Sequence, residues 1–150
     1  LKNLSTKGEK MKKFLFFVVA TLFVANSAYA KNDIVRFPIA AALAEPDAKA
    51  KLDPNIKFYF GNKSAGRKIT QQLSSNKKTN SVNKTDQAAC NRAFLSALLS
   101  FQDRAKKEGG NKVVNITSYY YKNVFVSDKE FECGVGTIMS GVTLRGYIAK

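Results

Sequence analysis

Apolar residues recur with a helical period between residues 85 and 108. They stand three and four positions apart, which places them on one face of a helix, at 89, 90, 93, 94, 97, 98, 101 and 105. Thr85 or Asp86 can cap the start of this helix, and Gly109 can end it. The pattern therefore predicts one long amphipathic helix whose apolar face packs on a sheet.

Shorter apolar runs earlier in the chain predict strands. Residues 33–38 and 56–60 are rich in β-branched and aromatic side chains, and proline or glycine bounds each run. A proline in first position predicts a short helix over residues 46–52. The polar segment 63–83 predicts one further strand, around residues 69–74, followed by a loop.

The last third of the chain predicts two long strands. Residues 113–126 and 131–148 are rich in Val, Ile, Thr, Tyr and Phe, and a short polar turn at 127–129 joins them. So short a connection requires the two strands to be antiparallel. Glycines in the final strand predict bulges or a close approach of the helix, at 134, 136, 141 and 146. The predicted fold class is α+β, a small and mostly antiparallel sheet with one long helix packed on one face.

Residues 11–30 have the three parts of a secretory signal peptide. A basic start is followed by an apolar run of about a dozen residues and by small residues at Ala28 and Ala30. The alternative, a membrane anchor, needs about 20 apolar residues. We expect cleavage after Ala30, which leaves residues 31–150 as a single mature α+β domain. Residues 1–10 are interpreted as an upstream extension or a start-site artefact, and the absence of a nearby lipid-acceptor cysteine predicts a soluble periplasmic or secreted bacterial protein.

Charge is the strongest compositional feature of this chain. Of its 25 basic and 11 acidic residues, five basic and one acidic lie in residues 1–30, so residues 31–150 hold 20 against 10, a net charge of +10. An excess of this size indicates anionic partners. Residues 54–85 contain no acid, and their basic residues form the predicted anion-binding set: Lys57, Lys63, Arg67, Lys68, Lys77, Lys78 and Lys84. A solvated basic loop beside an ordinary aromatic sheet is the alternative.

The chain has two cysteines, Cys90 and Cys133. Cys90 falls on the apolar face of the predicted helix, and Cys133 falls on a strand that this face can cover. An even number of cysteines in an oxidising compartment indicates a disulfide, so we predict one from helix to strand. Buried free thiols, or a redox or metal-binding pair, are the alternatives. Two thiolates alone leave a zinc site short of ligands, and the chain has no histidine to complete one.

The absence of histidine also removes Ser-His-Asp and Cys-His catalysis. Residues 61–66 have the spacing of a nucleotide-binding loop, but they lack the following Lys-Ser or Lys-Thr, so we interpret them as a glycine turn and expect no ATP. Asp128, Glu130 and Glu132 remain the candidates for a small cofactor-free hydrolase, although no apolar pocket that would raise a carboxyl pKa is evident. We predict a protein that is not an enzyme and carries no cofactor.

Three segments carry a resemblance to known proteins: residues 94–121 (FLSALLSFQDRAKKEGGNKVVNITSYYY), 131–134 (FECG) and 141–146 (GVTLRG). The chain resembles small secreted bacterial proteins commonly labelled "excinuclease ATPase subunit" and, more distantly, the YbjQ/RcsF-like group of small α/β domains. That wider group includes an outer-membrane stress sensor, so the resemblance implies a binding or sensing role in the envelope. It supplies no catalytic motif.

These observations lead to one functional expectation. The mature domain is a non-enzymatic envelope protein that binds or senses a partner through a basic surface. The expected partner is an anionic envelope component or an envelope protein, rather than a nucleic acid. A cofactor-free hydrolase and a cysteine-based metal carrier are the alternatives.

Overall fold

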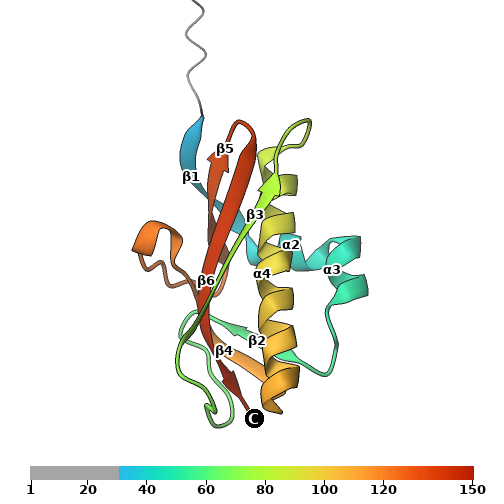
Figure 1. The fold of residues 1–150 in the computed structure, drawn as a ribbon, viewed down its shortest axis with the longest axis vertical. Helices are drawn as coiled ribbons and strands as arrows, with labels where there is room; N and C mark the ends of the chain where they lie inside the picture. The colour runs from blue at the N-terminus through green and yellow to red at the C-terminus, as the bar shows by residue number, and fades with distance from the viewer. Residues whose placement is uncertain (1–30) are drawn as a thin grey trace, which may run out of the picture.

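The computed structural model describes residues 31–150, so the predicted upstream extension (1–10) and signal peptide (11–30) lie outside the described residues. A curled six-stranded sheet packs against one long helix (Figure 1). The elements in chain order are β1 (Asn32–Pro38), α2 (Ile39–Ala44), α3 (Pro46–Lys51), β2 (Lys57–Phe60), β3 (Leu73–Asn80), α4 (Asp86–Glu108), β4 (Lys112–Ser118), the 3-10 helix η1 (Tyr120–Lys122), β5 (Glu130–Gly136) and β6 (Met139–Ala149).

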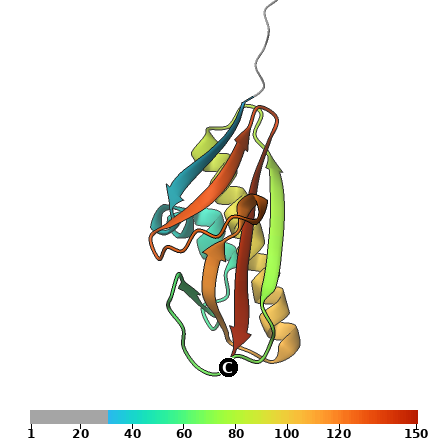
Figure 2. The ribbon, with the colours of Figure 1, turned by 90° about the vertical axis from the view of Figure 1, so that its left-hand side faces the viewer.

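The strand β6 lies at the centre of the sheet. On one side it pairs with β3, and on the other side it pairs with β5 near its start and with β4 towards its end (Figure 2). Beyond these, β1 pairs with β5, and β2 pairs with β4. Every pairing is antiparallel except β2–β4. The predicted fold class, with one long helix on a mostly antiparallel sheet, is therefore confirmed.

The long helix α4 has the boundaries that its sequence predicts. The Thr85 side chain caps it by accepting a hydrogen bond from the Ala88 amide at 3.1 Å. At the other end, Gly109 adopts a left-handed conformation with φ of 73°. All eight positions of the predicted apolar stripe are buried. None of the helices within residues 31–150 combines the length and apolar character that crossing a membrane requires.

A stack of three phenylalanines holds α4 to the sheet. The Phe94 ring of α4 lies between two others, with centroids 5.9 Å from Phe60 of β2 and 4.2 Å from Phe131 of β5. Phe94 and Phe131 are 1% exposed. Burial of such rings contributes strongly to folding, because each removes a large apolar area from water. The Cys90–Cys133 disulfide joins the same helix to the same strand.

The boundaries predicted for a strand at residues 69–74 are wrong. The strand β3 begins at Leu73 and continues to Asn80, through the residues that were expected to form a loop. Each of its residues has a partner on β6. Strand propensity is weak in this polar run, so pairing with β6 and half-burial against α4 decide its conformation.

The two long strands predicted for the last third of the chain are also wrong. The run 131–148 folds back on itself at Thr137 and Ile138, which separates β5 from β6. The run 113–126 stops being a strand after Ser118, because Tyr121 and Lys122 adopt positive φ angles of 48° and 62°. The antiparallel partner of β4 is consequently β6, not the segment that directly follows the turn.

The short helix predicted at residues 46–52 is present as α3, while α2 was not predicted. It begins directly after Pro38 and consists of alanines with two larger apolar residues. Its six residues are too few to show a helical period, so the sequence pattern gives little signal there. Both short helices lie on the side of α4 that faces away from the sheet, where α2 contacts α4 and α3 contacts α2 (Figure 1).

Candidate anion-binding surface

The strand register divides the predicted anion-binding residues between the two faces of the sheet. Lys77 of β3 lies opposite Val142, which is buried in the core beneath α4. Lys78 lies opposite Gly141 and therefore points to the face away from α4, here called the outer face. Two neighbouring lysines that look equivalent in the sequence thus occupy different environments.

Three cations follow the β3–β6 pair along the outer face. Besides Lys78, these are Arg145, whose guanidinium carbon lies 3.4 Å from the centroid of the Tyr119 ring, and Lys68, whose ammonium lies 3.9 Å from that of Tyr147. Stacking on an aromatic ring orients a cation without neutralising it. We call Lys78, Arg145 and Lys68 the basic strip. Neither β3 nor β6 contains an acidic residue.

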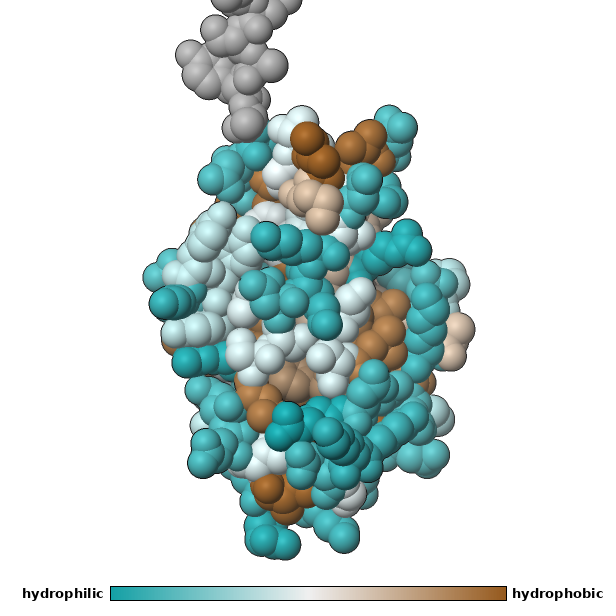
Figure 3. All heavy atoms as spheres, in the orientation of Figure 1, coloured by the Kyte–Doolittle hydropathy of each residue, from teal (hydrophilic) through white to brown (hydrophobic). Residues whose placement is uncertain are grey.

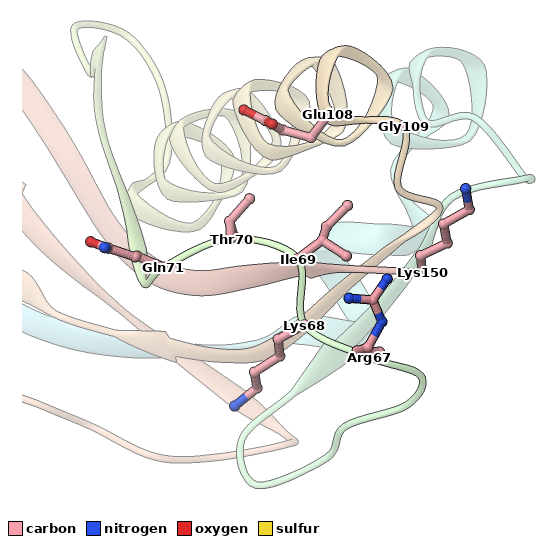
Figure 4. A pocket seen from close by; sticks show the side chains of 8 residues that line it. All are labelled: Arg67, Lys68, Ile69, Thr70, Gln71, Glu108, Gly109 and Lys150. Atoms are coloured by element: carbon pink, nitrogen blue, oxygen red, sulfur yellow. The ribbon is translucent and has the colours of Figure 1, made fainter.

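An open cleft of about 670 Å³ continues the basic strip at the end of β6 (Figure 4). Lys68 lines it together with Arg67 and Lys150, and the backbones of Arg67 and Lys150 exchange two hydrogen bonds of 3.0 Å. Figure 4 shows the Lys68 side chain directed away from the other two. The carboxylate of the cleft, Glu108, is 2.7 Å from Arg104 of the same helix. The cleft therefore adds two cations to the surface.

The remaining members of the predicted set do not join this surface. Lys63 forms an ion pair of 3.0 Å with Asp128, and its hydrogen bond and charge lower the pKa of that carboxyl. The Lys84 ammonium donates to the Asn80 carbonyl oxygen at 2.8 Å. Lys57 lies on β2, which extends the sheet beyond β4, away from β3. Of the seven predicted residues, Lys78 and Lys68 share the outer face of the sheet at a distance from each other, and Arg67 lines the adjoining cleft.

Sequence reasoning missed Arg145 and Lys150. The prediction considered one continuous basic stretch, whereas the surface is assembled from strands that are far apart in the chain. A signal for Arg145 was present, because residues 143, 145 and 147 alternate in the sequence with apolar residues or glycine, which predicts that the three share one face of a strand. Nothing local identified β3 as the neighbour of that strand.

An aromatic ring lies beside Lys78 at one end of the basic strip. Gly134 and Gly141 face each other across β5 and β6, and an added Cβ at Gly134 would overlap the Tyr120 ring. The close approach predicted for these glycines is therefore made by a tyrosine on the outer face, not by the helix. Burial, followed by a hydrogen bond with Tyr121, raises the pKa of Tyr120 to about 12. Its hydroxyl stays neutral at physiological pH.

In the surface view of Figure 3, hydrophilic residues cover most of the visible face, and apolar residues appear in separate patches. The face seen in this view is therefore mostly polar.

The three candidate carboxylates do not assemble as a catalytic group. Glu132 is paired with Arg36 at 3.5 Å, and the guanidinium carbon of Arg36 lies 3.9 Å from the centroid of the Phe125 ring. Asp128 is paired with Lys63, and the direction of its pKa shift is opposite to the one a general acid needs. Glu130 is exposed. Two of the three carboxylates, those of Glu132 and Asp128, therefore form ion pairs with basic side chains.

The predicted disulfide between Cys90 and Cys133 is confirmed. Both residues are fully buried, and the described chain holds no free cysteine. Within residues 31–150, no three His, Cys, Asp or Glu side chains gather as metal ligands. A metal site on these cysteines would first require reduction of the bond, because thiolates are the ligands.

In comparisons with known proteins, no family model, curated protein or solved structure matched this chain. The resemblance to small secreted bacterial proteins consequently stays a prediction.

Proposed function

We propose that this protein is an exported, non-enzymatic binding module for a polyanionic component of the bacterial cell envelope. One observation carries the proposal: five cations from separate parts of the chain lie along the outer face of β3 and β6 and the adjoining cleft, while both strands lack acidic residues. The export signal predicted at residues 11–30 and the disulfide support an envelope location.

The spacing of the cations favours a polymer over a small anion. Lys78 lies opposite Gly141, and Lys68 forms a bridge with Ala149, eight residues further along β6. At about 3.3 Å per residue, this separation is about 26 Å. A single phosphate or carboxylate cannot reach both groups. A chain of repeated anionic groups can contact them together, and the sum of weak exposed contacts then depends steeply on salt.

The opposite placement of Lys77 and Lys78 supplies a matched pair of variants. We expect Lys78→Glu to elute from a phosphocellulose column at clearly lower salt than the unchanged protein, and Arg145→Glu to behave similarly. Lys77→Glu changes the net charge equally but on the other face, so its elution should shift much less. Circular dichroism of each variant checks that the fold is retained.

Equal shifts for Lys77→Glu and Lys78→Glu would contradict the surface assignment. Retention would then depend on total charge alone, as expected for any strongly basic protein. A larger loss in the Lys78→Glu, Arg145→Glu double variant than in either single variant would support simultaneous contact of one polymer with both cations.

Export makes a separate prediction that does not depend on the ligand. Protein recovered from the cell envelope without reductant should have a mass that begins at Lys31 and is two hydrogens below that of the fully reduced chain. Mass spectrometry before and after reduction measures both properties. A mass that retains residues 11–30, or one unchanged by reduction, would contradict the envelope location.

A further inference from the structure

A hollow of about 210 Å³ lies on the outer face of the sheet, at the Lys78 end of the basic strip. Three glycines of β5 and β6 line it together with Lys78 and the side chains of Tyr120 and Tyr121. A site that encloses a drug-sized ligand has a volume of roughly 300–1,000 Å³. The hollow is smaller than this, so it suits one ring-sized unit of a longer ligand.

The loop between β4 and β5 holds Tyr121 at this hollow. The loop crosses the outer face of the sheet (Figure 2), and two backbone hydrogen bonds of 3.1 and 2.9 Å between Ser118 and Phe125 close it. Tyr121 and the next residue, Lys122, adopt positive φ angles of 48° and 62°, a conformation that residues other than glycine rarely adopt. The Tyr121 side chain is nevertheless 65% exposed. Its burial therefore does not account for the strain, and strained residues of this kind cluster at functional sites.

The two tyrosine rings form an angled surface rather than a slot. Their centroids are 4.4 Å apart, and their planes are inclined by 57°. Because the rings of Tyr120 and Tyr121 already contact each other, a flat base cannot insert between them. The exposed Tyr121 ring can instead receive the C–H groups of a sugar ring, since the face of an aromatic ring is negative and these groups are weakly positive.

The charge at the hollow selects an anionic ligand. Lys78 is exposed and is the one charged side chain among the described residues that line it. Asn32 of β1 also lines the hollow and offers an amide that can exchange hydrogen bonds with hydroxyl groups. The neighbouring acid, Asp33, lies opposite Val135, which is buried in the core. Asp33 is therefore on the other face of the sheet and does not neutralise Lys78.

The pairing of a cation with an aromatic ring recurs along the basic strip. Arg145 lies on the ring of Tyr119, and Lys68 lies on the ring of Tyr147. Both rings are half-buried. A polymer that carries an anionic group on successive rings can therefore contact a charge and a ring together at more than one point. A polymer with charges alone would use only the cations.

We infer that the polyanion bound by this surface is an acidic polysaccharide, with one sugar ring lying on Tyr121 in the hollow and its anionic group on Lys78. This inference rests on the proposed function, because it names the class of polymer that the basic strip binds. Hydroxyl groups of the sugar exchange hydrogen bonds with the Asn32 amide. Binding then has two parts, a charge attraction that salt screens and a stacking contact that does not depend on charge.

Two polymers of matched length and charge test this inference. Oligogalacturonate carries a carboxylate on every sugar ring, and poly-L-glutamate carries carboxylates without sugar rings. Isothermal titration calorimetry at one salt concentration measures the affinity of the mature protein for each. We expect oligogalacturonate to bind about tenfold more tightly, because stacking on an aromatic ring adds to the charge contacts. Oligothymidylate of the same charge tests whether the rings prefer nucleobases.

Variants of Tyr121 separate stacking from charge. Tyr121→Ala removes an exposed ring, so it should lower the affinity for oligogalacturonate about tenfold and leave the affinity for poly-L-glutamate unchanged. Tyr121→Phe keeps the ring and should restore the affinity. Val124→Ala is the matched control, because Val124 is an exposed apolar residue of the same loop that does not line the hollow. Lys78→Glu should weaken binding of both polymers, since both carry carboxylates.

Equal affinities of the unchanged protein for oligogalacturonate and poly-L-glutamate would overturn the inference and leave the proposed polyanion binding intact. The same conclusion would follow if Tyr121→Ala weakened binding of both polymers equally or of neither. Tighter binding of oligothymidylate than of oligogalacturonate would overturn the inference by assigning the rings to nucleobases. Failure of both carboxylate polymers to bind at low salt would contradict the proposed function itself, and the inference with it.

Discussion

Replacing both Cys90 and Cys133 by alanine should lower the free energy of unfolding by about 4 kcal/mol, because the disulfide closes a long loop of the unfolded chain. The two residues are separated by 43 positions and join α4 to β5. Both residues are 0% exposed in the core, so the alanines that replace them gain no contact with water to offset the lost disulfide bond. Urea denaturation followed by circular dichroism measures the change from the midpoint and slope.

Reduction of the unchanged protein provides the control for this variant. Urea denaturation in excess dithiothreitol should give a stability close to that of the double alanine variant, because both chains lack the loop constraint. Similar stability of the oxidised protein and the double variant would contradict a stabilising role for the disulfide. The fold would then depend on noncovalent packing of α4 alone.

Replacing Phe94 by alanine should cost about 3–5 kcal/mol of unfolding free energy, the usual range for a buried phenylalanine. The ring is 1% exposed and lies between Phe60 and Phe131, so its removal leaves a cavity at the junction of helix and sheet. Urea denaturation again measures the effect. The surface variant Val124→Ala, at a residue 59% exposed, should change stability by less than about 0.5 kcal/mol.

A loss below about 1 kcal/mol for Phe94→Ala would mean that the surrounding core relaxes to fill the cavity. Phe94 and Cys90 are four residues apart and occupy the same face of α4. Phe131 and Cys133 likewise share one face of β5. The aromatic contact and the disulfide consequently fasten the same two elements, and effects of their removal are expected to be non-additive.

The elements that the sequence predicted well are those with a strong local signal. The stripe from Ala89 to Ala105 has a helical period over more than four turns, and Thr85 and Gly109 mark its ends. Two cysteines allow only one pairing within the chain, so the disulfide needed no knowledge of the fold. The excess of basic over acidic residues was also evident from the sequence, although the positions of these residues on the folded surface were not.

The candidate sites were predicted less completely because their residues come together only through nonlocal contacts. Arg145 lies on the same face of the sheet as Lys78 because β6 pairs with β3. The register of that pairing places Lys77 on the opposite face. The burial of Asn91 was not identified from sequence, because the residue lies beside the predicted apolar stripe and its hydrogen-bond partner, Glu45, is 46 positions away in the chain.

The amino-acid sequence was thus sufficient to predict the α+β class, the long helix, the helix-to-strand disulfide and the excess of positive charge. Periodicity, capping residues and counts suffice for these properties, because each depends on neighbouring residues or on composition. Three further features became apparent from the folded structure: the polar run 73–80 is a strand, the chain turns at Thr137 and Ile138, and particular cations share one face of the sheet. Strand pairing and register depend on contacts between distant segments, and a shift of one residue would exchange the two faces of β3.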